Sequence, residues 1–141
     1  MDNELSSKEL AELMLKQDYF STWLGIEILE VDEKYCKIKM EVREDMINGL
    51  RTLHGGVSFS LADSALAFSS NNTNDASVAL QCSINFTQAA RAGDVLYAES
   101  KLISETRKTG IYNIELKNQL DQLVAVFRGT VYKIGKKVTE L

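Results

Sequence analysis

The sequence predicts an α+β domain in which a long antiparallel sheet curls around one buried helix. Two helical segments, over about residues 7–17 and 55–70, are separated by two strands and followed by a run of longer ones. The strands alternate apolar and polar residues, which is typical of antiparallel sheets with one buried face. The second helical segment is apolar or small on almost every side, as helices in a protein core are. Helices kept apart from antiparallel strands define the α+β class, and 141 residues suffice for one domain.

The first helix is expected to begin at a capping box. Ser6 and Glu9 have the spacing at which each side chain can accept from the other residue's backbone N–H. The apolar residues that follow lie near helical spacing and predict one buried face: Leu10, Leu13, Met14 and Phe20. The region ends at Leu24-Gly25, and a strand over residues 26–31 leads to a turn at residues 32–34.

A second strand is predicted from strict alternation over residues 36–42. Residues 44–53 are expected to form a loop that contains Asn48-Gly49, and Gly55-Gly56 opens the central helix. Four longer strands, the last two joined by a hairpin turn at residues 118–121, complete the predicted sheet: Ser77–Thr87, Asp94–Glu105, Thr109–Asn118 and Gln122–Ile134.

Composition and charge exclude several classes of function. The formal net charge is −4, whereas general nucleic-acid binders are basic. No apolar stretch approaches the ~20 residues that span a bilayer, and the acidic start, residues 1–5, does not resemble a signal peptide. Cys36 and Cys82 lie in strand-like segments without metal-ligand spacing, which fits a reduced cytoplasmic interior. With a single histidine in the chain, a multi-His metal site would have to be completed by carboxylates, and we expect no metal site.

Asp63 is the first candidate for chemistry. It lies in the apolar helix, and none of its neighbours three and four residues away is basic: Phe59, Ser60, Leu66 and Ala67. A carboxylate in that setting costs free energy unless a distant partner neutralises it or it meets water in a cleft. The alternative is an exposed polar position or a local hydrogen bonder.

The segment His54-Gly55-Gly56, at the junction of loop and helix, is the second candidate. Glycines at such a junction let another group approach the backbone closely. The first free N–H groups of a helix suit a phosphate or a developing oxyanion. The alternative is a tight turn with an ordinary capping role, in which His54 is a structural histidine.

Gly55 and Asp63 cannot act on the same bond within one chain. They are eight residues apart on one helix, which places them ~12 Å apart along its axis. Two copies of the helix packed antiparallel would bring each Gly55 near the partner's Asp63. The sequence therefore favours a two-fold dimer with paired sites at the interface.

Other candidates carry weaker signals. Residues 56–60 do not form the Gly-x-Ser-x-Gly elbow of hydrolases, and a Ser58–His54 pair lacks a third, orienting group. Arg107 and Lys108 lie at a predicted turn between strands, where a solvated surface is the usual role. A phosphate contact made together with Arg91 is the alternative.

The motif around the central helix resembles the signature of a known family. The stretch Asn48-Gly49-x-x-x-x-His54-Gly55-Gly56-x-x-Phe59-x-Leu61-Ala62-Asp63-x-Ala65 is similar to that of hotdog-fold acyl-CoA thioesterases, in particular the phenylacetic acid degradation (PaaI-type) family. Later segments extend the resemblance, which covers about residues 17–135: Gly93-Asp94, Thr109-Gly110-Ile111-Tyr112 and Val126-Phe127-Arg128-Gly129.

The resemblance implies a single hotdog domain over residues 1–141, a sheet wrapped around a central helix, assembled as a homodimer at minimum and usually as a homotetramer. It implies a thioester hydrolase that needs neither metal nor separate cofactor, because coenzyme A is part of the acyl-CoA substrate. An aromatic acyl group of the hydroxyphenylacetyl type, as in phenylacetate degradation, is the expected substrate. Four apolar residues could line an acyl pocket, although core positions are their more common role: Leu50, Phe59, Leu66 and Phe68.

The resemblance also implies roles for individual residues. Asp63 matches the catalytic carboxylate, acting as general base toward water or as direct nucleophile, and Gly55 matches the residue whose N–H polarises the thioester carbonyl. His54 and Asn48 match positions that hold the loop and the attacking geometry. Substrate contacts are expected from Gly56, Arg91, Arg107 and Lys108. Some relatives carry a strand Ser or Thr near the attacking water, where this chain has Ala79, with Ser77 and Ser83 close by in sequence.

Two other functions stay open at this level. A hotdog enoyl-CoA hydratase or dehydratase would use His54 and Asp63 as an acid–base pair near the acyl β-carbon. A non-catalytic acyl-CoA-binding protein would hold substrate and product alike without releasing a thiol.

Overall fold

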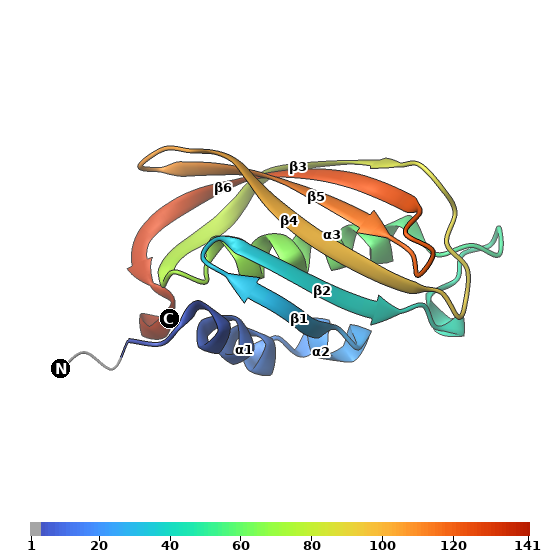
Figure 1. Cartoon of the computed structure of the whole chain (residues 1–141), viewed down its shortest axis with the longest axis horizontal. Helices are drawn as coiled ribbons and strands as arrows, with labels where there is room; N and C mark the ends of the chain where they lie inside the picture. Colours follow the sequence, from blue (N-terminus) through green and yellow to red (C-terminus); the bar gives the residue numbers. More distant parts are fainter. Residues whose placement is uncertain (1–3) are drawn as a thin grey trace.

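A six-stranded antiparallel sheet wraps around a central helix, α3 (Gly55–Ser70), in the computed structural model (Figure 1). The structure describes residues 4–141, so Met1–Asn3 of the acidic start lie outside the described residues. The sheet order is β1-β2-β4-β5-β6-β3. Its strands are β1 (Glu27–Asp32), β2 (Tyr35–Glu41), β3 (Asp75–Phe86), β4 (Val95–Glu105), β5 (Thr109–Lys117) and β6 (Leu123–Lys137). The predicted architecture is confirmed, and each strand end lies within three residues of its predicted position.

The core lies between α3 and the inner face of the sheet. Five apolar residues of α3 are at most 1% exposed, and they pack against inward residues of β2, β4, β5 and β6. The helix packs tightly on the sheet at Gly129, where an added Cβ would lie 2.6 Å from Leu66 Cδ2. The five apolar residues are Leu61, Ala62, Ala65, Leu66 and Phe68.

Two short helices precede the sheet. α1 (Ser7–Gln17) begins at the predicted capping box, in which the Ser6 and Glu9 side chains each accept from the other's backbone N–H at 3.1 Å. A separate helix, α2 (Tyr19–Leu24), was not predicted, and its N-cap is Asp18. Phe20 lies on α2 and is 53% exposed, so its predicted place on the buried face of the first helix was wrong. Asp18 leaves the helical conformation (φ −95°, ψ 89°), and the helical spacing of α1 is not continued beyond it.

β3 forms one edge of the sheet and pairs only with β6 among the described strands. Three of its apolar side chains are more than half exposed, namely Val78 (51%), Leu80 (64%) and Phe86 (57%). Its other edge has no strand partner within residues 4–141, and the strand also contacts α3. An uncovered strand edge with apolar side chains is a surface on which another chain can pair.

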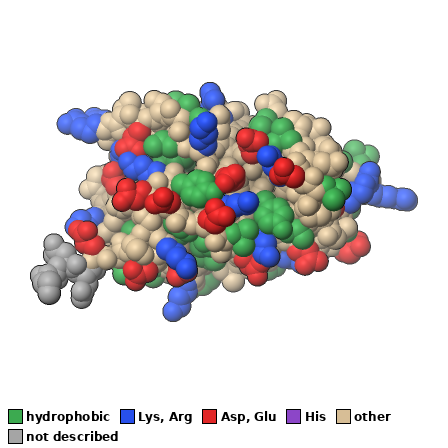
Figure 2. Space-filling view, in the orientation of Figure 1, with side chains coloured by type: hydrophobic (Ala, Val, Ile, Leu, Met, Phe, Trp, Pro, Cys, Tyr) green, Lys and Arg blue, Asp and Glu red, His purple; other side chains and the backbone are tan. Residues whose placement is uncertain are grey.

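The rest of the surface is mixed in charge. Figure 2 shows acidic and basic side chains interspersed over the face in view, without a broad area of one sign.

The predicted loop over residues 44–53 contains one 3₁₀ turn, Glu44–Met46. Within residues 4–141, no helix combines the length and apolar character needed to cross a bilayer.

Candidate active site

The start of α3 presents one free backbone donor. The His54 side chain caps the helix, because its Nδ1 accepts from the Gly56 N–H at 2.9 Å. The His54 carbonyl accepts from the Val57 N–H, also at 2.9 Å. Within the described part of the chain, the N–H of Gly55, which lies between His54 and Gly56 in the sequence, has no hydrogen-bond acceptor. A free N–H at a helix N-terminus is suited to a carbonyl oxygen that gains negative charge.

Asn48 shapes the loop that precedes this helix. Its Oδ1 accepts from the backbone N–H groups of Leu50 (2.8 Å) and Thr52 (3.2 Å), and its Nδ2 donates to Thr52 Oγ1. The backbone N–H of His54 then donates to the Met46 carbonyl at 2.9 Å. These contacts place Asn48 in a loop-holding position and leave the first turn of α3 accessible.

Asp63 lies half-buried on α3 and has neither an ion pair nor a hydrogen bond within residues 4–141. Burial raises the pKa of its carboxyl group, and the nearby Asp18 carboxylate raises it further. Burial first and the Asp63 carboxylate second also raise the pKa of the Cys82 thiol on β3. Asp63 is thus a carboxylate without a cation, placed between α2 and β3.

A hydrogen-bonded chain fixes α2 beside Asp63. Asp18 accepts from the backbone N–H and the hydroxyl of Ser21, at 2.9 Å and 2.5 Å. Ser21 Oγ lies 2.7 Å from Ser64 Oγ, directly after Asp63 in the sequence. The sequence analysis missed this contribution, although Asp18 followed three residues later by Ser21 is a helix N-cap pattern that could have indicated it.

The two main candidates lie on the same helix but do not meet in one protomer. Gly55 is at the first position of α3 and Asp63 lies eight residues further on, ~12 Å along the helix axis. Neither is buried, and the least covered face of α3 includes Asp63 together with small residues at helical spacing: Gly56, Ser60 and Ala67.

The predicted basic contacts separate into two regions. Arg91 lies beside the loop before α3, because its Nη1 donates to the Arg51 carbonyl at 3.4 Å and the Leu53 N–H donates to the Ala90 carbonyl. The exposed Arg107 and Lys108 form the turn between β4 and β5, at the opposite end of the protomer from this loop (Figure 1). The prediction that these two residues share a phosphate with Arg91 is therefore wrong within one protomer.

The predicted acyl-pocket residues also separate. Leu66 and Phe68 are core residues, and Phe59 packs edge-on against Phe127 with ring centroids 5.2 Å apart. Leu50 is 84% exposed at the tip of the loop before α3, because the turn held by Asn48 carries it outward.

The serine candidates contribute little to this region. Ser58 is 3% exposed, and Ser83 lies on the outer face of the sheet. Ala79, the position where some relatives carry a hydroxyl, is exposed on β3. Ser77 Oγ is buried and has no hydrogen-bond partner in the described part of the chain. It lies near the start of β3, close to Asn71, whose Oδ1 accepts from the Ser77 N–H.

Phe86 is a neighbour of Gly55 that the sequence analysis did not identify. A Cβ added to Gly55 would lie 2.9 Å from Phe86 Cζ and 3.2 Å from Cε1. The tip of the ring therefore lies against Gly55, the residue that carries the free N–H. This contact forms because the fold brings the end of β3 over the start of α3, and the sequence alone does not indicate it.

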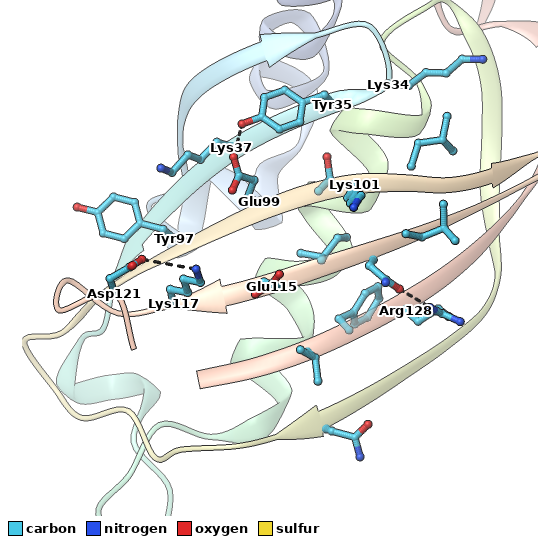
Figure 3. Close-up of a pocket in the computed structure, with 18 of the residues that line it drawn as sticks. Lys34, Tyr35, Lys37, Tyr97, Glu99, Lys101, Glu115, Lys117, Asp121 and Arg128 are labelled. Atoms are coloured by element: carbon cyan, nitrogen blue, oxygen red, sulfur yellow. Dashed lines mark hydrogen bonds and ion pairs between the residues drawn. The ribbon is translucent and has the colours of Figure 1, made fainter. Parts of the chain in front are cut away.

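A large groove lies elsewhere, on the outer face of the sheet. It has a volume of about 1300 Å³ and is lined by charged, polar and apolar side chains of the strands and adjoining turns (Figure 3). Lys37, Glu99, Glu115 and Arg128 are among them, whereas Gly55 and Asp63 are not. Within residues 4–141, no group of three or more His, Cys, Asp or Glu side chains is arranged to hold a metal ion.

Comparisons with known proteins identify the family of this chain. The family model described as the thioesterase superfamily matches residues 50–125, which include the end of the loop, α3, β3, β4 and β5. The acyl-coenzyme A thioesterase PaaI of Escherichia coli is 40% identical over 92% of this chain and 92% of its own length.

Solved structures give the same result. The structure of the Escherichia coli PaaI protein from the phenylacetic acid degradation operon has a TM-score of 0.91 and 38% identity, over 93% of this chain and 95% of that one. A Streptococcus mutans protein solved with bound acetyl-CoA has a TM-score of 0.76 and 28% identity, over 79% and 90% of the two chains. This chain therefore belongs to the thioesterase superfamily and, within it, to the PaaI-type hotdog-fold acyl-CoA thioesterases.

Proposed function

We propose that this protein hydrolyses an acyl-CoA thioester to a free acid and coenzyme A, with coenzyme A entering as part of the substrate. The observation that carries the proposal is that one helix presents both a free N–H at Gly55 and an unneutralised, half-buried carboxylate at Asp63. The first can polarise a carbonyl, and the second can take a proton from water.

In this mechanism the thioester oxygen accepts a hydrogen bond from the Gly55 N–H. A water molecule transfers a proton to Asp63 while its oxygen bonds to the carbonyl carbon, and negative charge develops on the oxygen that faces Gly55. The C–S bond then breaks, and the proton held by Asp63 passes to the departing sulfur. A carboxylate whose pKa is raised by burial is a stronger base than an exposed one, which favours the first step.

Each site is completed by two protomers. The least covered face of α3 carries Gly56, Ser60 and Asp63, and small residues at this spacing let two helices approach closely. Suppose that two copies of α3 cross antiparallel near Ser60. Gly56 lies four residues before the crossing point in one helix, and Asp63 lies three residues after it in the partner helix. Because the helices run in opposite directions, Gly56 and the partner's Asp63 then come to the same level along the helix axis. The uncovered edge of β3 beside α3 supports the same two-fold arrangement.

Mixed dimers test the sharing of the site. One protomer carries Asp63→Ala and the other Gly55→Pro, so a shared arrangement leaves one site with both residues intact. We expect each homodimer to be nearly inactive and the mixed dimer to recover up to half of the wild-type activity. A mixed dimer as inactive as the two homodimers would contradict a shared site.

The acyl group that we propose is aromatic, of the arylacetyl type. The support is the 40% identity to the Escherichia coli enzyme, whose structure is described as coming from the phenylacetic acid degradation operon. Two dimers associated as a tetramer is the assembly that we expect, and sedimentation at micromolar concentration measures it. Thiol release from a panel of arylacetyl-CoA and alkanoyl-CoA thioesters tests both the reaction and the preference. Hydration of an enoyl-CoA without thiol release, or binding without turnover, would contradict the proposed function.

A further inference from the structure

β3 runs along α3 so that its inner face spans the distance between the two candidate residues. Cys82, Ile84 and Phe86 alternate toward the helix, whereas Ser83 and Asn85 line the groove on the outer face. Four residues of strand cover ~13 Å, and the eight residues of helix between Gly55 and Asp63 cover ~12 Å. The strand segment from Cys82 to Phe86 and the helix segment from Gly55 to Asp63 therefore have about the same length.

The inward side chains of β3 from Cys82 to Phe86 form a strip along α3, and contacts fix both ends of this strip. At one end the Cys82 thiol lies close enough to Asp63 for the carboxylate to raise its pKa. At the other end the Phe86 ring touches Gly55. The backbone just after Phe86 is held, because the Thr87 N–H donates to the Val124 carbonyl at 2.9 Å and its Oγ1 donates to the Leu123 carbonyl at 2.9 Å.

Phe86 is held at its base but is 57% exposed, beside a backbone donor that has no acceptor among residues 4–141. A carbonyl that bonds to the Gly55 N–H must bring its substituents close to this ring, because the tip of the ring touches the same residue. One substituent is the acyl group and the other is the sulfur of the coenzyme A arm.

The chemistry of the strip selects between these two substituents. The side chains of Cys82, Ile84 and Phe86 offer almost no hydrogen-bonding groups, so the amides of the coenzyme A arm would lose their water contacts there without replacement. An apolar acyl group loses nothing in that position, and an aromatic one gains ring–ring contact with Phe86.

We propose that Phe86 is a specificity-determining residue, whose ring forms the wall against which the acyl group lies while its carbonyl is bound at Gly55. The proposal rests on the proposed thioesterase function and adds the surface that selects the acyl group. It predicts a preference for flat, bulky apolar acyl groups over acetyl.

The test compares kcat/KM for phenylacetyl-CoA and acetyl-CoA in the wild type and in Phe86→Ala, Phe86→Tyr and Phe86→Leu. We expect Phe86→Ala to lower kcat/KM for phenylacetyl-CoA about tenfold and to change that for acetyl-CoA less than about threefold. Phe86→Tyr keeps the ring and should retain the preference, whereas Phe86→Leu should lose most of it. Leu80→Ala is the matched control, since Leu80 is a large apolar side chain of the same strand and is 64% exposed.

The outcomes separate the two proposals. A wild-type protein that releases no thiol from any acyl-CoA contradicts the thioesterase function itself. An active wild type in which Phe86→Ala and Phe86→Leu lower both substrates equally, or leave the ratio unchanged, overturns the role of Phe86. A ratio that changes as much in Leu80→Ala also overturns it, because the effect would then belong to the strand and not to the ring.

Discussion

Replacing Gly55 by proline removes the free N–H while keeping the helix. Gly55 is the first residue of α3, a position where proline is tolerated because no intrahelical hydrogen bond is lost. The preceding residue, His54, has φ −61° and ψ 130°, which lies in the region that a residue before proline prefers. The exchange therefore removes the N–H donor and leaves the path of the backbone unchanged.

The expected magnitude follows from the loss of one oxyanion donor. Such losses lower kcat by on the order of 10²–10³-fold, equivalent to roughly 3–4 kcal/mol in the activation barrier. Proline also introduces a Cβ 2.9 Å from Phe86 Cζ, about 1 Å closer than carbon atoms usually pack. The ring is the free end of an exposed side chain and can move aside, so we expect the free energy of unfolding to fall by about 1 kcal/mol or less.

Gly55→Ala is the matched control, because it introduces the same Cβ and keeps the N–H. Initial rates of thiol release and thermal unfolding are measured for both variants. We expect Gly55→Ala to lose activity through displacement of Phe86, and Gly55→Pro to lose on the order of 10²-fold more. Equal kcat values in two folded variants would refute the role of the Gly55 N–H.

Two further predictions concern Asp63 and the contact of α3 with the sheet. Asp63→Asn should lower kcat by orders of magnitude, yet raise the melting temperature by a few degrees at pH 7. The sign follows from the raised pKa: the folded state favours the protonated carboxyl, so its contribution to stability is present in acid and is lost as the pH rises through the folded-state pKa. The gain should vanish at pH 3, and a gain that persists there would contradict the reasoning. Gly129→Ala should lower the free energy of unfolding by about 1–3 kcal/mol, because the added Cβ would lie 2.6 Å from the buried Leu66 and 3.1 Å from Phe127; denaturant unfolding measures it, and an unchanged midpoint would refute the tight contact.

The fold could be predicted because its signals are local. The alternation over β2 and the apolar surface of α3 need only the sequence, and the capping box at Ser6 is read over four residues. α2 escaped prediction because Asp18 interrupts the helix without a glycine or proline to mark the break. The exposed position of Leu50 depends on the local turn around Asn48, which the sequence analysis did not use to place this side chain.

The candidate site was predictable only in part. His54, Gly55 and Asp63 belong to one helix and its cap, so their relative positions follow from helix geometry. The neighbours that surround them come from distant segments. Asp18 reaches Asp63 through the packing of α2, and Phe86 reaches Gly55 through the path of an edge strand, and neither relation is encoded in local sequence.

The uncovered edge of β3 has a consequence for handling the protein. From Ala76 to Phe86 the strand carries no charged residue and no proline, the two features by which proteins usually block unwanted strand addition. In the proposed dimer, a second copy lies against this edge and shields it. Dilution, or a substitution that separates the copies, would expose this edge as a template for fibrillar aggregation. We therefore expect a solution of a weakened assembly to become turbid once the copies dissociate.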